Sequence, residues 1–198
     1  NVAIGKNAGI ENSTGSRNTA IGYNAWDDSD STLANNDNTF IGANSGGGTW
    51  ATNPSLKNTC VGVATMTAIC NQALENVAVG YESLNLVTGG AYNTAIGSQS
   101  GEVITTGQGN TMIGNQAGAS STVGNYNTII GHKADVDTNT DSYHVRLGHY
   151  GGIKFATARV TLDDSYTGTP ADGDAAHSNA LFVIPNKSYI SKVYATVV

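Results

Sequence analysis

The sequence predicts an all-β protein: a repetitive β-solenoid, or β-roll, of 17–20-residue coils that assembles into a parallel homotrimeric fibre, followed by a β-sandwich-like C-terminal portion. Three observations support this prediction. The composition is unlike that of a helical domain, a pentapeptide recurs at an almost constant step, and both faces of the expected strands are apolar. We expect residues 1–148 to form the solenoid and residues 149–198 to begin a C-terminal β-rich domain that is incomplete here.

The composition argues against helices. The 198 residues include 25 Gly, 22 Asn and 23 Thr but only 8 Leu. Gly, Asn and Thr are poor helix formers, and Leu is normally among the commonest residues. The 9 Lys and Arg against 15 Asp and Glu give a formal net charge of −6, which disfavours nucleic-acid binding. No apolar run is long enough to span a membrane.

The repeated unit is Asn-(Thr/Val)-x-(Ile/Val)-Gly. It occurs eight times, with glycine-to-glycine steps of 17, 20, 20, 18, 17, 17 and 17 residues, and a degenerate ninth copy ends at Gly148 after another 17. Each copy is short and rich in β-branched residues, so we expect a strand, with a second short strand completing each coil. Successive coils should then stack about 4.8 Å apart. The repeat residues that we expect to have a structural role are Asn18, Ile21, Gly22, Asn38, Ile41, Gly42, Asn58, Val61, Gly62, Asn76, Val79, Gly80, Asn93, Ile96, Gly97, Asn110, Ile113, Gly114, Asn127, Ile130 and Gly131.

Two apolar rows alternate along the expected strands. One is the Ile/Val row that precedes the glycines, and the other is the residue before it. That second row is Ala3, Ala20, Phe40, Cys60, Ala78, Ala95, Met112 and Ile129. A strand that is apolar on both faces needs cover on both sides. One row can line the thin interior of the coil, and we expect the second, mostly small, row to pack against other copies about a trimer axis.

The repeat asparagines form a column if the coils stack. Their side chains can bond the backbone of a turn or the next Asn, and the alternative is a ligand-binding ladder. The two 20-residue steps carry longer linkers, 27–37 and 47–57, which we expect at the surface. Trp50 lies in the second linker and is a candidate contact residue, whereas Trp26 occupies a repeat position and is expected to pack between coils. Aromatic rings at coil corners or linkers, among them Tyr81, Tyr92 and Tyr126, can stack on sugars or anchor a protein partner.

The chain offers little catalytic or metal-binding chemistry. Asp135, Asp137, Asn139 and Asp141 alternate like the start of a calcium loop, but the glycine and the glutamate that such a loop needs are missing, so these residues are weak candidates and a solvated turn is favoured. Zinc-helix, nucleophile-elbow and phosphate-loop motifs are absent, so we expect no cofactor and no enzyme activity. Cys60 and Cys70 are expected to be buried free thiols, with a disulfide across one coil as the alternative.

The C-terminal portion, residues 149–198, does not follow the repeat. Residues 152–162, 180–184 and 188–198 are expected to form strands, and residues 163–179 form a polar loop with Gly168, Pro170 and Gly173. So few strands make a marginal core by themselves, so neighbouring chains or further sequence should complete it.

The repeat resembles two families of fibrous proteins. The segments NTAIGYNA at residues 18–25, NTAIG at 93–97 and NTMIGNQAG at 110–118 are similar to the head repeats of trimeric autotransporter adhesins and to the shaft repeats of bacteriophage tail fibres. Adhesin repeats are typically shorter, so the 17–20-residue unit is closer to the phage shafts. The segments SNALFVIP at 178–185 and SYISKVY at 188–194 also resemble strands of tail-fibre and virion structural proteins of tailed phages.

The resemblance implies a structural and adhesive segment of a phage tail fibre, located in the virion tail, that acts as a stiff trimeric spacer. Its expected partners are other copies of itself, other fibre or tail proteins, and a glycan or protein receptor on the host surface. Nucleic acid and membrane insertion are not expected. The first alternative is the head of a bacterial trimeric surface adhesin, or an extracellular filament, at the bacterial cell surface. A β-helical polysaccharide depolymerase is the less favoured alternative.

Overall fold

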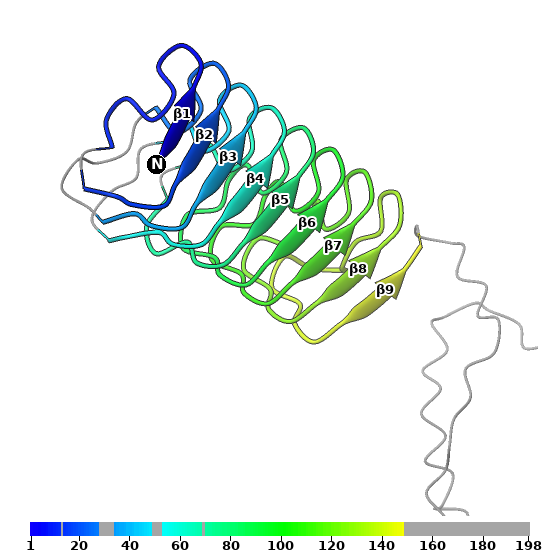
Figure 1. Ribbon diagram of the computed structural model, residues 1–198. Helices are drawn as coiled ribbons and strands as arrows, with labels where there is room; N and C mark the ends of the chain where they lie inside the picture. Colours follow the sequence, from blue (N-terminus) through cyan, green and yellow to red (C-terminus); the bar gives the residue numbers. More distant parts are fainter. Residues whose placement is uncertain (13, 28–33, 49–52, 69, 149–198) are drawn as a thin grey trace, which may run out of the picture. The chain divides into compact units, whose positions relative to one another are not determined.

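The computed structural model describes residues 1–148, except 13, 28–33, 49–52 and 69. In these residues nine three-residue strands follow one another, one to each coil (Figure 1). They are β1 (Val2–Ile4), β2 (Thr19–Ile21), β3 (Thr39–Ile41), β4 (Thr59–Val61), β5 (Val77–Val79), β6 (Thr94–Ile96), β7 (Thr111–Ile113), β8 (Thr128–Ile130) and β9 (Val145–Leu147). Within those residues no helix has the length and hydrophobicity needed to cross a membrane.

The strands form one parallel sheet in chain order, and each strand pairs with the next at the equivalent repeat position. Thr94 lies opposite Thr111, and Ile96 lies opposite Ile113. The degenerate ninth copy pairs in the same register, with Ile130 opposite Leu147. The predicted all-β solenoid is therefore confirmed, and its coils stack as Figure 1 shows.

The side of the sheet that faces the interior differs from the prediction. The middle residue of β2 to β8 is buried, from Ala20 through Phe40 to Ile129. The Ile/Val row points outward, and its members Ile41 and Ile113 are 36% and 37% exposed. The expectation that the small row meets other chains is therefore wrong. The chain folds back directly over the middle residue of β2 to β8, and this thin interior suits a row that is mostly small.

The prediction of a second strand in each coil is also wrong. After the strand the chain turns tightly, and the second and fourth residues after the glycine have positive φ in most coils. In one coil these residues are Gln99 at φ 56° and Gly101 at φ 59°. Left-handed residues reverse the chain within a few positions, so no second strand can extend there. Isolated parallel bridges join Leu56 to Leu74 and Leu74 to Ala91.

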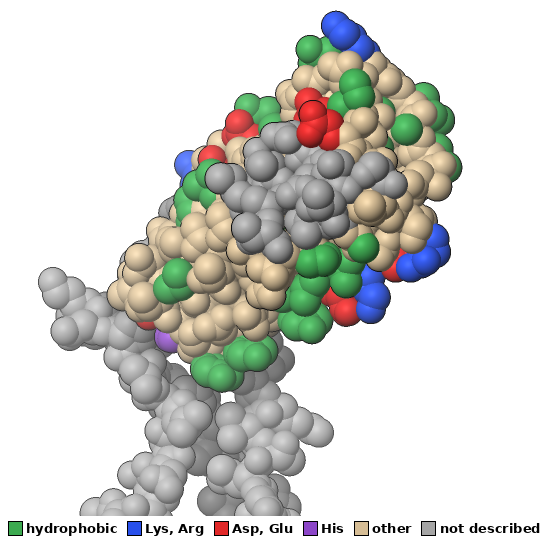
Figure 2. All heavy atoms as spheres, turned by 90° about the vertical axis from the view of Figure 1, so that its left-hand side faces the viewer, with side chains coloured by type: hydrophobic (Ala, Val, Ile, Leu, Met, Phe, Trp, Pro, Cys, Tyr) green, Lys and Arg blue, Asp and Glu red, His purple; other side chains and the backbone are tan. Residues whose placement is uncertain are grey.

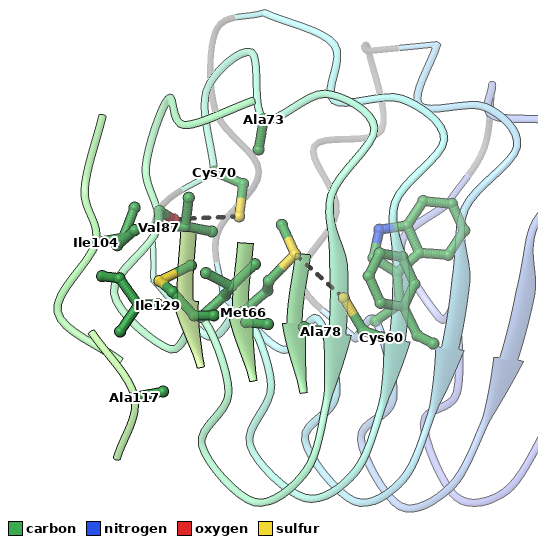
Figure 3. Close-up of a cluster of buried hydrophobic side chains, with 14 of the residues drawn as sticks. Cys60, Met66, Cys70, Ala73, Ala78, Val87, Ile104, Ala117 and Ile129 are labelled. Carbon is green, nitrogen blue, oxygen red and sulfur yellow. Dashed lines mark hydrogen bonds between the residues drawn. The ribbon is translucent and has the colours of Figure 1, made fainter. Parts of the chain in front are cut away.

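In several coils a large interior residue is matched by a small one. Ala20 shares its coil with Trp26, Phe40 with Gly46, and Met112 with Gly118. A Cβ at Gly46 would lie 2.5 Å from Cδ1 of Phe40, and the rings of Trp26 and Phe40 stack with centroids 5.8 Å apart. Figure 3 shows this core further along the stack, where the Cys60 Sγ and Met66 Sδ atoms are 3.1 Å apart.

The repeat glycines form a column in which the backbones of adjacent coils meet. Gly97 has φ 133°, and a Cβ placed on it would lie 2.5 Å from the carbonyl oxygen of Gly114 in the next coil. Gly62 is similar, with its added Cβ 2.2 Å from the oxygen of Gly80. A side chain would therefore meet both an unfavourable backbone conformation and a neighbouring carbonyl, so glycine is required at this position. The predicted β-rich portion at residues 149–198 lies outside the described residues.

Candidate functional site

The repeat asparagines are buried and join the coils. The Asn93 Oδ1 atom accepts the backbone N–H of Asn110 at 3.0 Å, and the Asn93 Nδ2 atom donates to the Gly107 carbonyl at 2.8 Å. The same pattern of bonds to the next Asn recurs at Asn18, Asn38, Asn58, Asn76, Asn110 and Asn127. In the last of these the donor is the backbone N–H of His144. This is the backbone-bonding role that the sequence predicts, and such burial leaves the ladder inaccessible to a ligand.

The outer face of the sheet carries a continuous apolar row, which we call the outer stripe. Its members are Ile4, Ile21, Ile41, Val61, Val79, Ile96, Ile113, Ile130 and Leu147. A row of threonines runs beside it and includes Thr94, Thr111 and Thr128. Single exposed hydrophobic residues are normal, but an uninterrupted row of them is typical of an interaction surface.

A second row, the corner column, is the residue immediately before each repeat Asn or its His144 equivalent. It consists of Arg17, Asp37, Lys57, Glu75, Tyr92, Gly109, Tyr126 and Tyr143. Every member has positive φ, between 54° and 66°. Each member of this column precedes the threonine or valine that begins the strand of the same repeat by two residues, so the column forms one border of the outer face.

The first half of the corner column is a ladder of alternating charges. Arg17 holds Asp37 with two hydrogen bonds, Nε to Oδ1 at 2.5 Å and Nη2 to Oδ2 at 2.8 Å. Lys57 Nζ contacts Glu75 Oε1 at 3.1 Å. The hydrogen bond from Arg17 is the main cause of the lowered pKa of Asp37. These exposed pairs join the coils whose linkers are longest, and each is individually weak because water and salt screen it.

The second half of the corner column is aromatic. Tyr92, Tyr126 and Tyr143 are 56%, 55% and 77% exposed. The rings of Tyr126 and Tyr143 stack with centroids 5.2 Å apart and planes at 23°. Sequence reasoning identified Tyr92 and Tyr126 but missed Tyr143, although its place just before the ninth repeat was a readable signal.

The acidic segment that resembles a calcium loop directs its carboxylates to protein groups. Asp141 caps a turn: its Oδ2 atom accepts the backbone N–H groups of Asp137 and Thr138 at 3.0 and 2.9 Å. The Thr138 hydroxyl bond to Asp141 is the largest cause of the lowered pKa of that carboxyl group. Asp137 pairs with Arg146.

The other members of that segment are also engaged. The Asp135 Oδ1 atom accepts the N–H groups of Ser120 and Val136, and the Asn139 carbonyl accepts that of Thr122. Among the described residues no three His, Cys, Asp or Glu side chains gather as a cation site would require.

Both cysteines are free and buried. The Cys70 Sγ atom lies 3.6 Å from the Val87 carbonyl oxygen (Figure 3). Burial raises the pKa of Cys70 to about 12 and raises that of Cys60 well above its usual range. Thiols in this state are unreactive at neutral pH, because the thiolate is the nucleophile.

The two tryptophans have different outcomes. Trp26 is part of the core, as its repeat position predicts. Trp50, the candidate contact residue, lies outside the described residues.

On the face in Figure 2 most of the described surface is backbone or uncharged polar side chain, and charged groups are sparse. No protein-family model, curated protein or solved structure matches the chain. Function is therefore inferred from the fold and the surface.

Proposed function

We propose that this chain is a structural and adhesive segment of a bacteriophage tail fibre, in which three copies form a stiff spacer that carries contacts with the host surface. The outer stripe is the single observation that supports this proposal most. It places Ile, Val and Leu side chains in register on one sheet face along all nine strands. Burial of such a row between copies would be favourable and permanent, and low surface charge suits a permanent assembly.

The internal bonding supports the mechanical part of the proposal. Each coil is bonded to the next through the sheet, through the asparagine ladder and through the glycine column. Bending the stack would break several of these bonds at once. Three parallel copies would also present every surface site three times, so weak contacts with a host surface would add through avidity. The resemblance of the repeat to phage shafts favours a tail fibre over other fibrous proteins.

The mass of the whole chain in solution tests the assembly. Light scattering should give about three times the 20.3 kDa of one chain. The double variant Ile96→Ser/Ile113→Ser should lower that mass, because it places hydroxyls in the centre of the outer stripe. Leu86→Ser/Val123→Ser is the matched control, since these residues are 46% and 39% exposed but lie outside the stripe. A folded monomeric wild type would contradict the proposal.

The owner of the fibre is tested separately. A baseplate-binding region encoded upstream would support the phage assignment, whereas a membrane-anchoring translocation domain encoded downstream would support the bacterial adhesin. Incubation of the purified chain with capsular polysaccharide tests the depolymerase alternative. Release of new reducing ends would show that the chain is an enzyme and would contradict the spacer function.

A further inference from the structure

The tyrosines of the corner column are not required by the backbone. Tyr92, Tyr126 and Tyr143 have φ of 61°, 57° and 64°, a conformation that Gly and Asn adopt most readily. The same position and φ are occupied by Arg17 and Asp37 in earlier coils, so the coil closes equally well around a charged residue. The fold therefore gives no reason for aromatic rings in three of the last four coils.

Two of the rings, those of Tyr126 and Tyr143, are held against each other although they are exposed. Tyr126 stacks on Tyr143, and its ring also lies against Gly109, where an added Cβ would be 2.6 Å from the Tyr126 Cδ1 atom. Glycine at position 109 therefore leaves room for the ring of the following coil. A pre-positioned aromatic surface loses less conformational entropy when a ligand binds than a mobile one.

Most side chains on either side of these rings are uncharged hydrogen-bonding groups. Gln108, Asn125 and Ser142 precede Gly109, Tyr126 and Tyr143, and Thr94, Thr111 and Thr128 follow Tyr92, Gly109 and Tyr126, whereas Ala91 precedes Tyr92 and Val145 follows Tyr143. The Asn125 Oδ1 atom accepts the N–H of Gln108 at 2.8 Å, and the N–H of Asn125 donates to the Ser142 Oγ atom at 2.9 Å. These bonds fix the polar row beside the rings. The surface around Tyr126 and Tyr143 thus combines aromatic faces with hydroxyl and amide groups, and the charged column member before Tyr92, Glu75, is paired with Lys57.

We propose that Tyr92, Tyr126 and Tyr143 form a binding surface for the pyranose rings of a neutral polysaccharide on the host surface. The C–H face of a pyranose packs on an aromatic face, and its hydroxyls pair with neighbouring amides and hydroxyls. Three coil steps between Tyr92 and Tyr143 span about 14 Å, the length of a short oligosaccharide. This inference rests on the proposed host-contact function and assigns that contact to named residues.

A second copy of the chain is the less suitable occupant. The outer stripe already offers an aliphatic surface for contacts between copies, whereas the tyrosines stand at its border among polar groups. Buried between proteins, the phenolic hydroxyls would each need a partner, but in a sugar site they remain at the solvent edge.

The test uses cellohexaose and maltohexaose as neutral probes with the whole chain. Saturation-transfer NMR should show transfer to the pyranose C–H protons, and titration should give a measurable Kd for at least one probe. The double variant Tyr126→Ala/Tyr143→Ala should weaken that binding by about tenfold or more. Tyr23→Ala/Tyr81→Ala is the matched control, since these tyrosines are 52% and 51% exposed but follow the repeat glycine at the other border of the outer face, and it should leave binding unchanged.

Three results would overturn the inference. The first is the absence of saturation transfer to either probe at concentrations on the order of 10 mM. The second is an equal weakening of sugar binding in both double variants, and the third is loss of assembly in Tyr126→Ala/Tyr143→Ala. The last result would assign the column to the contact between copies. Light scattering on the same samples separates this failure from failure of the proposed fibre, because a trimer that binds no sugar contradicts only the tyrosine assignment.

Discussion

The side-chain oxygen of Asn93 accepts the backbone N–H of Asn110 in the next coil at 3.0 Å, while the Asn93 amide donates to Gly107 in its own coil at 2.8 Å. One side chain thereby closes its own coil and fixes the next one in register. Because the arrangement recurs along the stack, the solenoid holds a continuous line of buried amides that water cannot reach. Its stability depends on these polar contacts as well as on its small apolar core.

Asn93→Ala should destabilise the solenoid by about 2–3 kcal/mol, because it leaves the Asn110 N–H and the Gly107 carbonyl buried without a partner. Urea denaturation measures the free energy of unfolding, and faster hydrogen exchange at Asn110 would locate the defect. Asn115→Ala is the control, since the Asn115 amide makes one exposed bond to the Ser98 carbonyl at 3.2 Å. Equal losses from the two variants would contradict the role of the ladder.

Gly97→Ala should cost about 3 kcal/mol or more, since the methyl group meets the Gly114 carbonyl and the residue keeps φ 133°. Thermal unfolding followed by circular dichroism would show the loss. Gly89→Ala should be far milder, because its Cβ would lie 3.3 Å from the Asn71 carbonyl oxygen without a positive φ. Similar melting temperatures for both variants would mean that the glycine column is not tightly packed.

The buried thiols should make the protein less stable at alkaline pH. The folded pKa of Cys70 is raised from 9.0 to about 12, so between these values the folded state holds a proton that the unfolded chain has released. Stability from this group is therefore complete below pH 9 and declines as pH rises toward 12. Urea midpoints across this range should fall less in Cys70→Ala, whereas identical slopes would contradict the assigned cause.

Native thiol accessibility provides a separate check on the cysteines. An aromatic disulfide reagent should label neither Cys60 nor Cys70 in the folded protein at pH 8, and both after denaturation, because each thiol is buried and unpaired with the other. Absence of labelling after denaturation under non-reducing conditions would indicate a disulfide across the coil instead.

Removing Arg17 should raise the pKa of Asp37. In the native protein the guanidinium hydrogen bonds lower that pKa below 3.8, so the pair stabilises the fold at neutral pH and its contribution is lost as pH falls through the folded pKa. Carboxyl NMR titration of Asp37 should show a higher pKa in Arg17→Gln and no change in Lys133→Gln, a cation in a different row. High salt should reduce the difference, since both groups are exposed.

The residue patterns of the repeat made the solenoid predictable, but they left open which side of each strand faces inward. Both rows were apolar, and the mostly small row was assigned to contacts between copies. A signal in the sequence points to the right side: in several coils the middle strand residue and the fourth residue after the glycine have opposite sizes, as in Ala20 with Trp26 and Phe40 with Gly46. Residues that compensate for each other in volume share one interior.

The sequence by itself determined the coil length, the strand in each coil, and the asparagine and glycine columns, because these depend on short-range chemistry repeated at a fixed step. Only the tertiary structure decided that Ala20 and Phe40 face inward, that Ile113 faces outward, and that Tyr126 and Tyr143 meet in one column. The reason is the left-handed backbone at residues such as Gln99 and Gly101. It turns the chain back over the sheet, and the direction of that turn, which hydrophobic alternation does not encode, sets the side that becomes the core.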